Sequence, residues 1–255
     1  MKLLSIWRVS LRPDPFWVSS MAVFVGSILS LSAQTNPASA SPAPAPNALT
    51  QPVTPATNPS VQPATSEGTD PFNDPLIKQI QARSEKAVRG DTKETKALTA
   101  DLEKWTKEQP GNYLLQAYLG SVYTLDSRDA WPGPGKLTFL RNGGKLMDAA
   151  VAAAPHNPAV RFVRAIDYFE LPFFFGKSAT ARDDFQILVR EVDGDIKTPY
   201  VLSPETQQAI YYYAGLSFKQ LAQLPQAKVA WSRGLLLDGA SPLGVKIKAE
   251  LASVK

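Results

Sequence analysis

The sequence predicts an all-α domain of paired helices at residues 71–255, preceded by a leader and a linker of different composition. From Thr69 onward, apolar residues recur three and four positions apart, which is the spacing of one helix face. In the same part of the chain, four pairs of Asp, Asn or Ser with a following proline punctuate the helical pattern: Asp74-Pro75, Asn157-Pro158, Ser203-Pro204 and Ser241-Pro242. The first residue of such a pair can cap a helix, and the proline suits the first helical position. Each pair therefore marks the expected start of a helix.

Residues 1–40 are predicted to be a signal peptide. Three basic residues in the first twelve positions precede an uncharged, mostly apolar run from Phe16 to Ala33, and Ala38-Ser39-Ala40 fits the rule for cleavage after small residues. The apolar run also has about the minimum length for crossing a bilayer, so an uncleaved N-terminal anchor is the alternative. In either case we expect an exported protein of the periplasm or cell envelope, which contacts a membrane only through this segment.

Residues 41–70 are predicted to be a disordered linker. This stretch is rich in Pro, Ala and Thr, and no charged residue occurs between Pro15 and Ser66. Alternating Pro and Ala favours an extended chain with nothing to bury. The linker is either a tether that holds the folded part away from a membrane or a spacer with no role.

Charge and cysteine content exclude several classes of function. The formal net charge is +4, but Lys2, Arg8 and Arg12 against Asp14 already supply +2 of it within the first fourteen residues. The rest of the chain is nearly neutral, so a nucleic-acid partner is not expected. The chain contains no cysteine, which excludes disulfides, thiolate nucleophiles and cysteine-ligated metals.

The first half of the folded part should contain two helix pairs. Helices are expected over residues 74–89 and 92–109, separated by Gly90-Asp91, and a third should start at Tyr113. The Pro/Gly-rich stretch 131–136 then breaks the pattern, and we expect the helix to resume near Gly144 and to stop at Pro155. This interruption is predicted to be an inserted loop that could carry specificity.

The second half should contain two more pairs and a terminal helix. The third pair starts at Pro158 and is interrupted by Leu171-Pro172-Phe173-Phe174-Phe175-Gly176. We expect some of the three phenylalanines to fill the gap between the helices of this pair. Two rings exposed together would instead indicate a partner or a membrane. The fourth pair spans Glu205–Gly239 and turns at Pro225, and a final helix follows Ser241-Pro242.

The fourth pair resembles a tetratricopeptide repeat (TPR) of an exported bacterial type. The matching residues are Tyr211, Gly215, Phe218, Ala227, Trp231 and Gly234, whereas Gly239 stands where the family has its closing proline. The resemblance implies an α-solenoid of three to four helical hairpins with a C-terminal capping helix. It also implies protein–protein interaction in a concave groove lined by the first helix of each pair. By position, the groove residues would be Tyr118, Ser121, Phe162, Ile166, Phe169, Tyr212, Tyr213, Leu216 and Lys219, although each could instead be core.

Arg161 and Arg164 open a second functional hypothesis. They are three residues apart and share one helix face. Arginine at such positions either pairs with nearby carboxylates or forms a clamp for an anion. The clamp would make the chain a periplasmic small-ligand or transporter-associated binding protein. Both alternatives remain open from the sequence.

No residue pattern predicts catalysis, a metal site or a cofactor. His156 is the only histidine and is expected in a solvated turn, without the ligand spacing of a zinc site. Residues 133–138 lack the spacing of a phosphate loop. Glu191, Asp193 and Asp195 alternate, but the twelve-residue calcium loop is absent. We therefore expect a chain that is not an enzyme and has no cofactor.

Overall fold

The computed structural model describes residues 68–129 and 134–254, and every regular element in these residues is helical. The all-α prediction is thus confirmed for this part of the chain. The elements are η1 (Pro71–Asn73), α2 (Pro75–Val88), α3 (Thr92–Glu108), α4 (Tyr113–Asp129), α5 (Pro134–Ala153), α6 (Pro158–Glu170), η2 (Phe173–Phe175), α7 (Ser178–Val192), α8 (Pro204–Gln220), α9 (Leu224–Leu237) and α10 (Pro242–Ser253).

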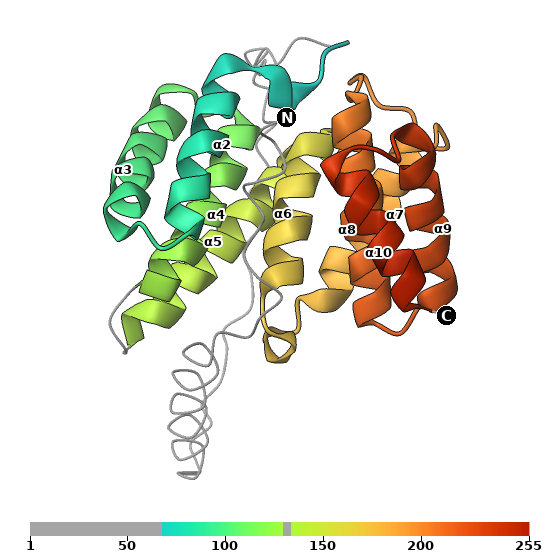
Figure 1. Cartoon of the computed structure of the whole chain (residues 1–255). Coiled ribbons are helices and arrows are strands. Elements are labelled where there is room, and N and C mark those ends of the chain that lie inside the picture. The colour runs from blue at the N-terminus through green and yellow to red at the C-terminus, as the bar shows by residue number, and fades with distance from the viewer. Residues whose placement is uncertain (1–67, 130–133, 255) are drawn as a thin grey trace, which may run out of the picture. The chain divides into compact units, whose positions relative to one another are not determined.

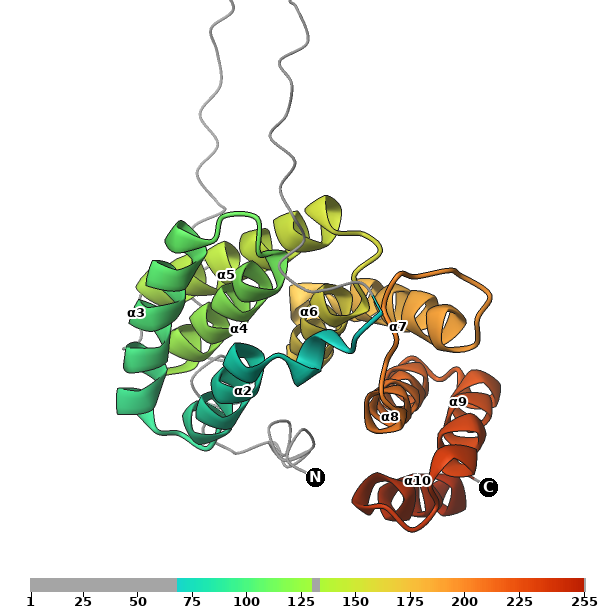
Figure 2. The same ribbon diagram turned by 90° about the horizontal axis from the view of Figure 1, so that it is seen from above.

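Consecutive helices pack as pairs, and the pairs stand side by side (Figure 1). The pairs are α2–α3, α4–α5, α6–α7 and α8–α9, and α10 packs on the last pair. Seen from above, α2, α4, α6 and α8 form an inner layer, and α3, α5, α7 and α9 form an outer layer (Figure 2). The first helix of each pair therefore lies beside the first helix of the next pair.

The four predicted capping residues all cap helices. Asp74 accepts hydrogen bonds from the backbone N–H of Leu76 and Ile77, and Asn157 caps α6 in the same way. Ser203 and Ser241 each accept one backbone hydrogen bond at the start of α8 and α10. In all four helices the proline lies in the first turn, where its missing N–H costs no hydrogen bond.

The prediction of an inserted loop up to Gly144 is wrong, because α5 already begins at Pro134. Gly144, near which the helix was expected to resume, lies with Gly143 in the middle of a 20-residue helix. Gly143 and Gly120 are needed for the crossing of α4 and α5. A Cβ atom on Gly143 would lie 2.5 Å from the carbonyl oxygen of Gly120, and one on Gly120 would lie 2.7 Å from that of Gly143. Residues 131–133 of the predicted loop lie outside the described residues.

A glycine also sets the crossing of α8 and α9. A Cβ atom on Gly215 would lie 2.2 Å from Nε1 of Trp231, so only glycine leaves room for the indole ring. Trp231 is fully buried, and its Nε1 donates a 3.0 Å hydrogen bond to the carbonyl oxygen of Tyr212. Two of the residues that carry the family resemblance, Gly215 and Trp231, are therefore in direct contact.

The predicted leader and almost all of the predicted linker lie outside the described residues. The described residues belong to one compact unit, whose core runs through all the helix pairs. Within this unit, no helix combines the length and apolar character that crossing a bilayer requires.

Candidate functional site

The predicted groove residues lie in the inner layer of helices. The seven apolar and aromatic ones belong to the core and are each less than a tenth exposed: Tyr118, Phe162, Ile166, Phe169, Tyr212, Tyr213 and Leu216. Ser121 is also buried, and Lys219 is half-buried. A partner on this face would therefore touch ring edges and side-chain termini, not whole side chains.

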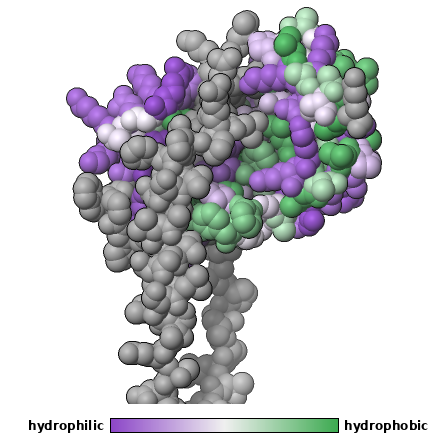
Figure 3. Space-filling view, turned by 60° about the horizontal axis from the view of Figure 1, so that its bottom comes forward, coloured by the Kyte–Doolittle hydropathy of each residue, from purple (hydrophilic) through white to green (hydrophobic). Residues whose placement is uncertain are grey.

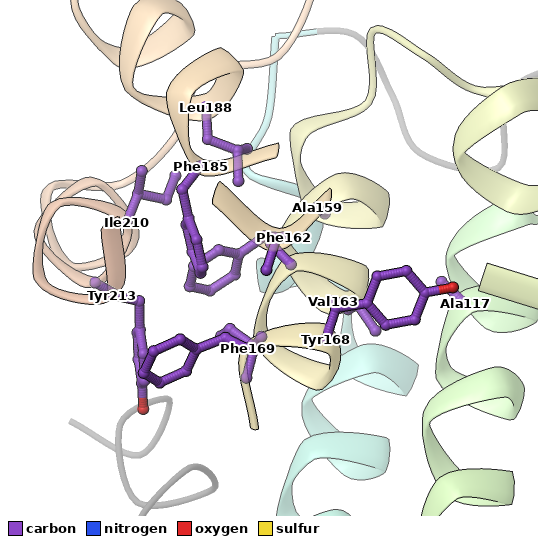
Figure 4. Close-up of a cluster of buried hydrophobic side chains, with 14 of the residues drawn as sticks. Ala117, Ala159, Phe162, Val163, Tyr168, Phe169, Phe185, Leu188, Ile210 and Tyr213 are labelled. Carbon is purple, nitrogen blue, oxygen red and sulfur yellow. The ribbon is translucent and has the colours of Figure 1, made fainter. Parts of the chain in front are cut away.

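The aromatic residues of this layer contact one another across helix boundaries. The ring of Phe162 on α6 lies edge-on to Phe72, to Phe185 and to Tyr213, with ring centres 5.9, 6.3 and 6.2 Å apart. Tyr213 in turn lies 5.1 Å from Tyr212. Figure 4 shows this cluster between α6 and α8. Phe162 thus joins η1, α6, α7 and α8 into one aromatic layer.

A buried carboxylate lies beside this aromatic layer. One oxygen of Asp167 accepts a 3.0 Å hydrogen bond from Thr124, while the other, Oδ2, finds no partner among the described residues. Burial raises the pKa of Asp167 to about 6, and the hydroxyl groups of Ser121 and Thr124 beside it oppose the rise. Nearby, the hydroxyl of Tyr118 accepts a 3.2 Å hydrogen bond from the side chain of Gln81.

Lys219 lies away from the aromatic layer, at the contact of α8 with α10. Its Nζ donates hydrogen bonds to Glu250 at 2.8 Å and to Ser253 at 3.0 Å. It also lies 5.9 Å from the ring centre of Trp231. These contacts hold the ammonium group of Lys219 between α8, α9 and α10.

Arg161 and Arg164 converge on one buried carboxylate, Asp184 of α7. Arg164 binds both oxygens of Asp184 at 2.8 Å, and Arg161 shares one of them at 2.8 Å. Arg161 also donates to the carbonyl oxygen of Pro155 at 2.8 Å, and Arg164 donates to Asp148 at 3.0 Å. Nε of Arg161 is buried and has no partner among the described residues. Burial alone would lower the pKa of Arg164, but hydrogen bonds and charge from Asp184 more than offset it, so the pKa is raised.

The network continues through Asp148 to the start of α7. Lys177 lies 3.6 Å from Asp148 and donates a 3.2 Å hydrogen bond to the hydroxyl of Tyr168, which donates to the carbonyl oxygen of Gly144 at 3.2 Å. The ammonium group also lies 4.3 Å from the centre of the Tyr168 ring, a cation–π distance. Helices α5, α6 and α7 are thus joined by charged and polar contacts.

The expectation that the phenylalanines 173–175 pack between α6 and α7 is wrong. None of the three is buried, and Phe173 and Phe174 are 80% and 48% exposed. The gap between α6 and α7 is filled by the Arg164–Asp184 contact and by Phe185, which leaves no space for further rings. The three rings pack on each other instead, with centres 5.9 Å and 4.7 Å apart.

The other candidate residues for catalysis or metal binding do not come together in one site. A cleft of about 590 Å³ lies between α7 and α9, and Arg161 and Arg164 are not among its lining residues. The alternating acidic residues do not converge: Glu191 is buried on α7, whereas Asp193 pairs with Arg233 and with the hydroxyl of Tyr211. His156 is exposed in a turn. In the described part of the chain, no acidic or histidine side chains gather as metal ligands would.

Two features of this region were not predicted from the sequence. The unpartnered oxygen of Asp167 depends on which residues surround α6, and no local pattern reveals that. The exposed loop had a signal, because Pro172 and Gly176 bracket three rings in a connection too short to fold back onto the core. In comparisons with protein-family models, with curated proteins and with solved structures, the chain has no match.

Proposed function

We propose that this chain is an exported TPR-like scaffold or adaptor, not an enzyme, which binds a protein or peptide partner along the inner face of α4, α6 and α8. In this proposal the four helix pairs form a solenoid that α10 caps. The observation that carries it is the aromatic layer around Phe162 of α6, to which η1, α7 and α8 contribute the neighbouring rings. Aromatic surfaces of this kind are favoured in partner recognition, because large rigid rings bury much area at little entropic cost.

A carboxylate at the end of that layer gives the face a place to orient a partner. Glu170, one turn beyond Asp167 on α6, is exposed, whereas the unpartnered oxygen of Asp167 is itself buried. An exposed carboxylate can accept hydrogen bonds from the donors of a docked peptide. The inner face therefore offers apolar ring edges together with one exposed carboxylate.

The alternative, a binding protein that holds an anion between Arg161 and Arg164, has less support. Both guanidiniums already share Asp184, and their other hydrogen bonds go to Asp148 and Pro155. An anion would have to displace a carboxylate that is only 2% exposed. Nε of Arg161 is the one buried guanidinium atom without a partner among the described residues, and the shared carboxylate already neutralises the pair. The network therefore supports a structural role for the two arginines.

Site-specific photo-crosslinking from the inner face tests the adaptor proposal. A photoreactive amino acid placed at Glu170 in the full chain should give discrete adducts with a partner protein in cells that export it. The same amino acid at Lys104, an exposed position on the outer helix α3, is the control. Identical adducts from both positions, or none from position 170, would count against a partner on the inner face.

A further inference from the structure

The first described residues of the chain are bound to the fourth helix pair, which is far away in the sequence. Asp70 is buried, and its Oδ1 accepts a 2.9 Å hydrogen bond from the N–H of Phe72. Its Oδ2 accepts hydrogen bonds from the N–H of Ser203 at 2.9 Å and from the hydroxyl of Thr206 at 2.7 Å. Ser203 caps α8 and Thr206 lies in its first turn. One carboxylate therefore ties the start of the domain to the start of α8.

Two further contacts hold the same segment in place. The N–H of Gly68 donates a 2.8 Å hydrogen bond to the carbonyl oxygen of Pro199, in the connection between α7 and α8. The ring of Phe72 is buried and lies edge-on to Phe162 of α6. Residues 68–73, which we call the N-terminal clasp, thus contact α6, the α7–α8 connection and α8, and α2 follows them directly.

The N-terminal clasp bridges the sparsest joint of the inner layer. Helix α4 packs closely on α6, whereas α6 and α8 touch each other at few residues. The connection between α7 and α8, residues 193–203, is also the longest one between helices of the described domain. Seen from above, η1 runs from α2 across α6 toward the start of α8 (Figure 2). The last pair is therefore attached to the rest by the packing of α7 on α8 and by the N-terminal clasp.

The N-terminal clasp acts at one end of the helix layers. It lies where α6 and α8 begin, whereas η2 lies at the opposite end (Figure 1). Figure 3 brings the end with η2 forward and shows hydrophobic surface next to hydrophilic surface there. The contacts of Asp70 thus fix the end of α8 at which that helix begins.

The contact of Asp70 has two distinct states. A buried carboxylate needs its hydrogen bonds, and the positive end of the α8 dipole stabilises the charge further. If α8 moves away, Asp70 loses Ser203 and Thr206 together, which are two of its three donors. Hydrogen bonds to an ionised acceptor are among the stronger ones in proteins, so an intermediate arrangement is disfavoured.

From these contacts we propose that the N-terminal clasp sets the position of α8, α9 and α10 relative to the first three helix pairs, with Asp70 as its positioning residue. The width of the inner face is thereby fixed by the segment that directly follows the linker, and not by the helix pairs alone. The consequence for a partner rests on the proposed function, because α8 carries Tyr212 and Tyr213 of the inner face. The N-terminal clasp itself does not.

The test measures the distance between two spin labels on either side of this joint, by double electron–electron resonance. Since the chain has no cysteine, Lys104→Cys on α3 and Leu236→Cys on α9 give one defined pair of labels in the full chain. Both side chains are exposed. Lys104→Cys with Lys145→Cys, an exposed position on α5, is the control pair, because both labels then precede the joint.

Asp70→Ala should shift the 104–236 distance by more than about 2 Å, the scale of a domain rearrangement, and broaden its distribution. The 104–145 distance should stay unchanged. Thr206→Val removes only one of the three hydrogen bonds and should produce a smaller shift in the same direction. Asp91→Ala is the matched control, because that carboxylate caps α3 within its own first turn and should affect neither distance.

An unchanged 104–236 distance in the variants that retain native helix content overturns the proposal. An equal shift in Asp91→Ala also overturns it, because loss of any capping carboxylate would then loosen the array. No partner takes part in this measurement. Absence of photo-crosslinked adducts from position 170 would therefore remove the adaptor proposal and leave the N-terminal clasp standing.

Discussion

The helix pairs α6–α7 and α8–α9 are neighbours in one array, yet different forces hold them together. In α8–α9 the helices approach closely, because Gly215 leaves room for the fully buried ring of Trp231. In α6–α7 the central contact is ionic, with two guanidiniums on the buried carboxylate of Asp184. The α8–α9 pair therefore depends on shape, and the α6–α7 pair depends on charge.

This difference extends to the connections of the two pairs. The α8–α9 turn comprises only residues 221–223 and is closed by backbone hydrogen bonds, with Ala222 at φ of 58°. The α6–α7 connection is longer and presents exposed rings. The exposed rings thus belong to the connection of the pair whose helices share the buried ion pair.

Removing the shared carboxylate should have the largest effect. In Asp184→Ala, Arg161 and Arg164 lose their common partner while remaining largely buried. Breaking a buried ion pair from one side costs about 3–5 kcal/mol. We expect a loss of that order in the free energy of unfolding, measured by urea denaturation with circular dichroism.

The neighbouring Asp183 provides the matched control. It is exposed and pairs with Arg182 at the surface, so Asp183→Ala should cost about 0–1 kcal/mol. Equal losses for the two variants would show that charge does not hold α6 to α7. An intact domain in Asp184→Ala that gains affinity for anions would revive the clamp hypothesis.

Filling the glycine position in the other pair should have the next largest effect. Gly215→Ala places a methyl group where the indole of Trp231 lies, and overpacking of this kind costs about 1–3 kcal/mol. Gly135→Ala is the control, because nothing lies within 4 Å of its added methyl group. That variant should be neutral or slightly stabilising, since alanine favours helix. If Gly215→Ala were equally harmless in thermal unfolding, shape would not govern the α8–α9 crossing.

The regular parts of this fold could be predicted from the sequence because their signals are local. Asp74, Asn157 and Ser203 cap helices through their own backbone neighbours. The Gly215–Trp231 contact follows from spacing within one hairpin. Such features depend on residues close in the chain, so periodicity and capping chemistry are sufficient to find them.

The features that failed or were missed depend on distant neighbours. The helix was expected to resume only near Gly144 because the sequence does not show that Gly143 packs against Gly120 inside a longer helix. The phenylalanines of η2 were placed in the core because the sequence does not show that Asp184 and Phe185 already occupy that space. For the same reason Arg161 and Arg164 left two hypotheses open. The candidate site thus needed the tertiary structure, whereas the helices did not.

The smallest expected effect concerns pH and again separates the two pairs. The buried carboxylates of Asp167 and Glu191 both belong to α6–α7, and burial raises the pKa of Glu191 to about 7, with Arg161 opposing the rise. Because the folded pKa exceeds the ordinary value, the folded state binds the extra proton between about pH 4.5 and 7. The free energy of unfolding therefore falls as pH rises through that window.

Glu191→Gln should remove only the part of this dependence that Glu191 contributes, because Asp167 and Glu170 keep their raised pKa values. One oxygen of Glu191 is buried and has no partner among the described residues, so a neutral amide avoids the cost of burying a charge there. At pH 8 we expect the variant to be more stable than the parent chain by about 1–3 kcal/mol, and at pH 4 the two should converge. Urea unfolding across this range measures it, with the exposed Glu108→Gln as control. An unchanged pH dependence would show that burying the charge of Glu191 does not destabilise the α6–α7 pair. The electrostatic contrast with α8–α9 would then rest on Asp184 alone.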